Sequence, residues 1–79
     1  MTGKRYRLFE ELKRFSIDNE SRNIKDLPDN NPLVIVESSM TFGRDLILLR
    51  GRIYDEVTNQ EMEFKIQRSH NGLEFSYIQ

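Results

Sequence analysis

Residues 61–67 constrain this fold more than any other stretch of the chain. Met62, Phe64 and Ile66 alternate with charged or amide side chains, which is the period of two expected of a strand with one buried face. Asn71-Gly72 follows, and this pair is typical of a type I′ hairpin turn because both central positions of that turn need positive φ. We therefore predict antiparallel strands at 61–68 and 73–78.

A two-residue turn at Asn71-Gly72 also predicts a register for this hairpin. Ile66 would lie opposite Tyr77 and Arg68 opposite Phe75. The apolar side chains of both strands then share one face of the sheet, and the pairing needs no slip.

The preceding strand, predicted at 45–54, alternates in the same way. Its inward set is Ile47, Leu49, Gly51 and Ile53, and its outward set is Leu46, Leu48, Arg50, Arg52 and Tyr54. A four-residue loop at 56–59 or a two-residue turn at Thr58-Asn59 keeps Ile53 on the same face as Met62 or Phe64, because an even-length connection preserves the faces. Gly51 in mid-strand indicates a bulge or the close approach of another element.

The N-terminal residues 4–17 predict an amphipathic helix with its apolar stripe at Leu8, Phe9, Leu12 and Phe15. Residues 18–32 are rich in turn formers and predict a long connection, with Ile24 and Leu27 facing the core. Connections of this length are either mobile or functional, which makes this one a candidate for a segment that a partner orders.

Residues 33–37 are apolar on both faces and predict a strand that is covered on both sides, with 40–43 as the link to the next strand. Together these elements predict a single α+β domain over residues 1–79, in which the helix packs on a four-stranded antiparallel sheet. The last three strands form a meander.

Composition narrows the chemistry and the compartment. The chain has no cysteine, which excludes disulfides and thiolate metal sites. It has no apolar run of signal-peptide or transmembrane length, so we expect a cytoplasmic protein that does not cross a membrane.

Catalytic residues are scarce in the sequence. His70 is the only histidine and stands beside a predicted turn, where a solvated polar side chain is common. The paired carboxylates flank turns or face basic residues on neighbouring strands, which favours cross-strand ion pairs over acid–base catalysis. We therefore predict a protein that is not an enzyme and has no catalytic, cofactor or metal site; an enzyme subunit that uses His70 is a remote alternative.

Leu46, Leu48 and Tyr54, which share the outward face of residues 45–54, have no structural explanation in this interpretation. Exposed apolar patches tend to mark protein interfaces, so we predict a small adaptor, regulator or inhibitor that binds another protein or a second copy of itself. The predicted contact residues are Leu46, Leu48, Arg50, Arg52 and Tyr54. The structural alternative is that the first strand or the helix covers both faces of this strand.

Nucleic-acid binding is the competing function, with Arg50, Arg52, Tyr54 and Lys65 as contacts. It is less favoured because acidic residues share the same face and because 12 basic against 13 acidic residues give a net charge of −1. The sequence predicts neither a membrane partner nor a small-molecule substrate.

Overall fold

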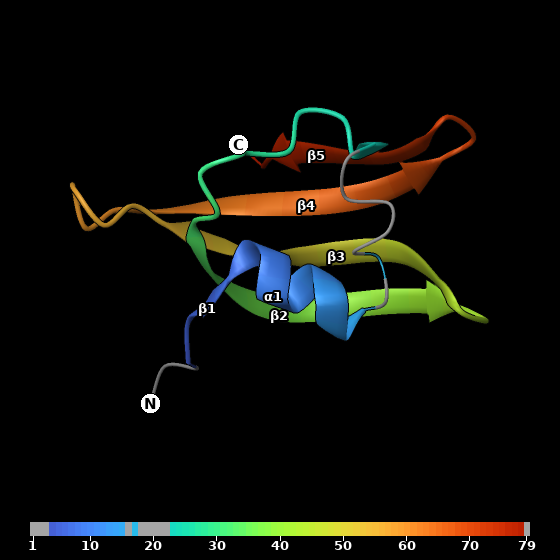
Figure 1. Cartoon of the computed structure of the whole chain (residues 1–79), viewed down its shortest axis with the longest axis horizontal. Helices are drawn as coiled ribbons and strands as arrows, with labels where there is room; N and C mark the ends of the chain where they lie inside the picture. Colours follow the sequence, from blue (N-terminus) through green and yellow to red (C-terminus); the bar gives the residue numbers. More distant parts are fainter. Residues whose placement is uncertain (1–3, 16, 18–22, 79) are drawn as a thin grey trace.

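The computed structural model describes residues 4–15, 17 and 23–78. It contains the helix α1 (Leu8–Arg14) and an antiparallel sheet of five strands in the order β1-β2-β3-β4-β5. The strands are β1 (Tyr6–Arg7), β2 (Leu33–Phe42), β3 (Asp45–Tyr54), β4 (Glu61–Ser69) and β5 (Gly72–Tyr77). Figure 1 shows α1 lying across one face of this sheet, over β2 and β3. The predicted α+β class and the helix on an antiparallel sheet are confirmed.

The sheet has five strands and not the predicted four, and the additional strand, β1, explains why the helix starts later than predicted. Tyr6 and Arg7 pair with Val34 and Leu33 as β1, and the Leu8 N–H donates to the Pro32 carbonyl at 2.9 Å. The backbone of residues 6–7 is therefore extended, and a helix beginning at residue 4 is wrong. The Asn31 side chain accepts a hydrogen bond from the Phe9 N–H at 2.9 Å, which satisfies one of the orphan donors of the first helical turn.

The helix also ends earlier than predicted, at Arg14. The Ile17 N–H donates to the Leu12 carbonyl at 3.0 Å, and Ile17 is buried in the core rather than closing the helix. Leu8 and Leu12 are fully buried, as the apolar stripe predicts, but Phe9 is only partly covered and Glu11 is buried instead of facing solvent. Asp18-Asn19 follow the predicted helix with residue types that suit a C-terminal cap, and that prediction lies outside the described residues.

The described part of the long connection, 23–32, packs along the far edge of the sheet. Lys25 forms a parallel bridge with Glu74, with its N–H 3.1 Å from the Leu73 carbonyl and its carbonyl 2.8 Å from the Phe75 N–H. Ile24 is buried, and Leu27 packs against the core, as predicted. Figure 1 shows this segment passing beside β5 and returning to β2. That a partner orders the connection stays a prediction.

β2 is longer than the predicted strand at 33–37 and reaches Phe42. Val36 pairs with Gly51 and Ser38 pairs with Arg50, so Glu37 is an extra residue in the ladder. Such a bulge bends a strand without ending it, so the prediction of a link is wrong for residues 40–42, which belong to β2, and correct for Gly43. The chain turns at Gly43-Arg44, where Gly43 has a φ of +62°.

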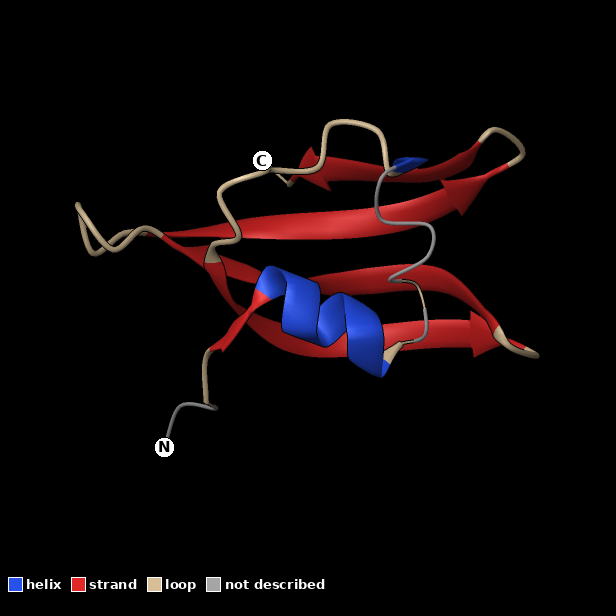
Figure 2. Ribbon diagram, viewed as in Figure 1, coloured by secondary structure: helices blue, strands red, loops and turns tan. Residues whose placement is uncertain are grey.

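The β3–β4 connection has the four-residue form that was one of the two predicted. Ile53 lies opposite Met62, and the Asp55 N–H donates to the Gln60 carbonyl at 2.8 Å. Figure 2 shows this loop at one end of the sheet and the β2–β3 and β4–β5 turns at the other end.

The β4–β5 hairpin differs from the predicted register by two residues. Ser69 pairs with Gly72, and Ile66 lies opposite Phe75 rather than Tyr77. The turn residues are His70 and Asn71, and Gly72 takes a positive φ of +107° while Asn71 does not. A slip of two residues leaves every side chain on its predicted face, so the predicted apolar face holds although the predicted turn is wrong.

The core lies between this face of the sheet and the cover formed by α1 and the connection. Phe64 and Phe75 stack at its centre with ring centroids 5.3 Å apart. The other members of the core cluster are Leu8, Leu12, Ile17, Ile24, Val34, Leu46, Leu49, Ile53, Ile66 and Leu73. Ile35, which pairs with Arg52, is also buried but is not part of this cluster. Within the residues described, no helix has the length and apolar character needed to span a membrane.

Candidate functional site

The sheet has an outer face, which we define as the face opposite α1. The strand register places the predicted contact residues Leu48, Arg50, Arg52 and Tyr54 on it, together with residues of β2 and β4. α1 covers the other face, and β2 lies beside β3 rather than over it. The structural alternative, in which the helix or the first strand covers both faces of β3, is therefore wrong for the described residues.

One half of the outer face is held by internal ion pairs. Arg52 pairs with Glu61 and lies 3.5 Å from Glu37, and the Arg5 guanidinium is 2.8 Å from the other oxygen of Glu61. Arg5 also stacks over the Tyr54 ring, 4.3 Å from its centroid. The predicted cross-strand ion pairing is thus confirmed for Arg52 and Glu61, and the cation and the ring predicted as contacts are already engaged within the chain.

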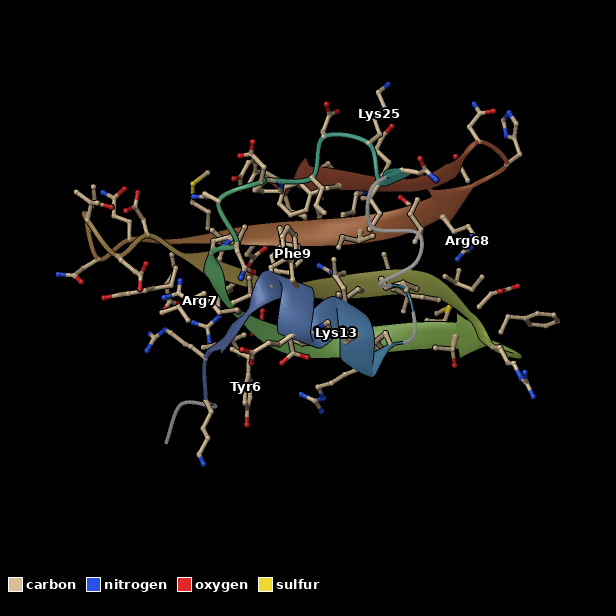
Figure 3. The ribbon with its side chains drawn as sticks, viewed as in Figure 1. Tyr6, Arg7, Phe9, Lys13, Lys25 and Arg68 are labelled. Atoms are coloured by element: carbon tan, nitrogen blue, oxygen red, sulfur yellow. The ribbon has the colours of Figure 1, made fainter. Side chains whose placement is uncertain are left out.

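Leu46 is not part of the outer face, and its predicted outward position is wrong. Met40 pairs with Leu48 but Thr41 pairs with Leu46, so Ile47 is an extra residue in β3. This bulge turns Leu46 to the side of Leu49, and Leu46 is fully buried in the core. The Arg68 guanidinium donates to the Leu46 carbonyl at 2.8 Å, and Figure 3 shows Arg68 near the end of the sheet that holds the β2–β3 and β4–β5 turns.

The other half of the outer face carries an apolar group that the core does not use. We call Met40, Phe42 and Leu48 the hairpin patch. Met40 and Leu48 lie directly opposite each other. Met40 is 58% exposed and Phe42 is 80% exposed, while Leu48 is half-buried. The predicted outward position of Leu48 is therefore confirmed, and Met40 and Phe42 join it because β2 continues past Glu37.

Two cations lie next to the hairpin patch. Arg50 and Lys65 are directly opposite each other on β3 and β4, an arrangement in which like charges repel. Neither forms an ion pair with any residue in the described part of the chain. Both line a shallow depression of about 230 Å³, whose other walls are Leu48, Gln67 and Ile78.

A second concave site lies on the opposite side of the molecule, and the sequence reasoning missed it. It is a groove of about 400 Å³ between the connection and the β3–β4 loop. Its apolar wall is formed by Pro28, Pro32, Ile53, Val57, Met62 and Tyr77. The alternation in residues 61–67 places Met62 on the core face, but it does not reveal that the core ends before Met62, which is 51% exposed.

The groups needed for catalysis are dispersed. His70 is exposed in the β4–β5 turn, and the described residues contain no group of three or more His, Asp or Glu side chains that could hold a metal ion. Asp55 accepts the N–H groups of Val57 and Thr58 at 2.8 and 3.2 Å. These backbone hydrogen bonds lower the pKa of the Asp55 carboxyl, and their evident role is to hold the β3–β4 loop.

Comparison of the chain with protein families, with curated proteins and with solved structures found no match.

Proposed function

We propose that this chain is a small protein-binding domain that acts through the hairpin patch together with Arg50 and Lys65. The observation that carries the proposal is the position of Met40 and Leu48 opposite each other on a face that the core does not use. Solvent-exposed apolar side chains grouped in this way are typical of interaction surfaces, with apolar contacts at the centre and charges at the rim.

The two cations indicate the chemistry of the partner. Arg50 and Lys65 repel each other across the β3–β4 ladder, and neither forms an ion pair with a described residue, although Glu37 and Glu63 line a depression with Arg50 and Glu74 lines one with Lys65. A carboxylate from a partner would relieve this repulsion and accept charge-assisted hydrogen bonds. We therefore propose a partner segment that combines acidic side chains with large apolar ones.

A protein partner is favoured over nucleic acid by the state of the other predicted contacts. Base stacking needs an open aromatic face, but the Tyr54 ring is covered by Arg5. Arg52 is neutralised by Glu61 and Glu37. Only Arg50 and Lys65 of the nucleic-acid set therefore lack a partner within the described residues.

The test is binding of the immobilised chain to two pools of short peptides, one rich in Glu, Phe and Leu and one with Lys in place of Glu. We expect retention of the acidic pool only, and loss of that binding in Leu48→Asp and in Arg50→Glu. Met62→Asp is the matched control, because Met62 is exposed on the other side of the sheet.

Equal retention of the two pools, or unchanged binding by the two patch variants in a folded state, would contradict the proposal. A single-stranded oligonucleotide serves as the third probe. Binding of that probe with log affinity falling as log salt rises, in the absence of peptide binding, would favour the nucleic-acid alternative instead.

A further inference from the structure

The edge of β2 is a separate feature from the outer face. On the side away from β3, β1 pairs with β2 only at Leu33 and Val34. In the part of the chain that is described, no strand pairs with this side of β2 from Ile35 to Phe42. Figures 1 and 3 show β1 and Tyr6 beside the first half of β2, while no drawn strand lies beside its second half on the side away from β3.

Among the described residues, nothing gives the open part of this edge the usual protection. Native proteins block strand edges with charges, prolines, bulges or a covering segment. Here the bulge is at Glu37, and the five residues after it, Ser38-Ser39-Met40-Thr41-Phe42, contain no charge and no proline and are all exposed. The backbone groups that point outward along this segment form a template for another extended strand.

We infer that two copies of this chain pair antiparallel through Ser38–Phe42 of β2 and form one continuous ten-stranded sheet, twice the five strands of one copy. Closed assemblies of identical chains are most often two-fold symmetric. A two-fold axis perpendicular to the sheet keeps the outer faces of the two copies on the same side of the joined sheet. The residue at the axis then lies opposite the same residue of the partner. Met40 is the centre of the uncharged segment, and the inferred register therefore pairs Met40 with the partner's Met40.

Charge complementarity supports a second copy as the occupant. In this register Ser38 lies opposite the partner's Phe42, and Glu37 lies opposite the partner's Gly43 and next to the partner's Arg44. Arg44 is exposed and forms no ion pair with a described residue. Each end of the shared segment thus brings an acid beside a base, while its apolar centre is uncharged.

The described residues leave room for this pairing. β1 lies beside the first half of β2, and residues 23–32 of the connection run along the β5 edge. The overlap is limited to five residues per copy, which makes the interface small and the association reversible. This inference goes beyond the proposed function: the interface includes Met40 and Phe42 of the hairpin patch, but it is formed by the backbone edge of β2 and does not use Leu48 or the cations on β3 and β4.

The test uses the inferred pairing of Met40 with the partner's Met40. Sedimentation velocity of the full chain over a dilution series up to millimolar concentration should show reversible dimerisation. Met40→Glu and Met40→Lys should each weaken the dimer by at least about tenfold, because like charges would face each other at the axis. An equimolar mixture of the two variants should restore association, because the opposed charges now attract.

The matched controls are Met62→Glu and Met62→Lys, since Met62 is 51% exposed against 58% for Met40 and lies on the opposite face. They should leave the dimer unchanged, and so should Arg50→Glu, which disables the proposed peptide site. Hydrogen exchange should show new protection at amides within 38–42 as concentration rises.

A chain that stays monomeric at every concentration would overturn the inference. So would a dimer that both Met40 variants leave intact, a mixture that associates no better than either variant alone, or new protection confined to other strands. None of these results decides whether acidic peptides bind, so the two proposals fail separately.

Discussion

The carbonyl oxygen of Ile35 stands 2.1 Å from the point where a Cβ on Gly51 would lie. The carbonyl belongs to backbone and cannot move aside as the end of a flexible side chain would. This close approach stands next to the bulge at Glu37, where β2 and β3 shift register. The prediction that Gly51 marks the close approach of another element is therefore confirmed, and that element is β2.

Gly51→Ala should destabilise the fold by about 1–3 kcal/mol, because the added methyl group forces the backbones of β2 and β3 apart. Urea unfolding followed by circular dichroism measures the change as a lower midpoint. Arg50→Ala, at the neighbouring exposed position, should stay within about 0.5 kcal/mol of the natural chain. Equal midpoints for Gly51→Ala and the natural chain would mean that the two strands separate without cost.

Leu46 and Leu48 should respond in opposite ways to truncation, because the bulge at Ile47 sends one into the core and the other to the outer face. Leu46→Ala removes a fully buried side chain and should cost about 2–5 kcal/mol. Leu48→Ala should cost less than about 1 kcal/mol, since Leu48 is only half-buried. Thermal unfolding of the pair provides the measurement, and comparable losses would show that the bulge does not exist in solution.

These two leucines also show what the sequence could and could not predict. Alternation alone assigns the faces of β4 and β5 correctly, even though the turn differs from the predicted one by two residues. Alternation assigns Leu46 to the wrong face because Ile47 is an extra residue in β3, which reverses the faces of the residues before it. No residue type near Ile47 indicates a bulge. The same limit applies at Glu37, where a bulge lets β2 continue into Met40 and Phe42 and so creates most of the hairpin patch.

The predicted start of the helix is wrong for a different reason. The stripe of Leu8 and Leu12 is helical in both the prediction and the structure, but Tyr6 and Arg7 pair with β2 because the chain segment before β2 returns alongside them. That long-range contact overrides local helical periodicity. The burial of Glu11 is likewise invisible in the sequence, since its i+3 spacing to Arg14 suits an exposed ion pair equally well.

Arg14→Ala should destabilise the fold by about 1–3 kcal/mol, because it leaves the buried Glu11 carboxylate without the guanidinium that now lies 3.1 Å from each of its oxygens. Glu11→Met, alone or combined with Arg14→Ala, should be neutral or stabilising, since an apolar side chain of similar volume suits a buried site. Chemical unfolding of the three variants tests this relation. A Glu11→Met variant as unstable as Arg14→Ala would show that the carboxylate contributes through further contacts.

The decrease in the free energy of unfolding at low pH should depend on Asp55. Hydrogen bonds from the Val57 and Thr58 N–H groups lower the pKa of its carboxyl below the ordinary 3.8, so the folded state binds fewer protons there than the unfolded state does. The stabilisation is therefore full above pH 3.8 and is lost as pH falls through the lowered pKa. Asp55→Asn keeps an oxygen acceptor but does not titrate. The difference in unfolding free energy between the natural chain and this variant should therefore narrow only below pH 3.8. Two results would contradict this prediction. One is a difference in unfolding free energy that stays constant down to pH 2. The other is an NMR titration in which the Asp55 carboxyl has its ordinary pKa.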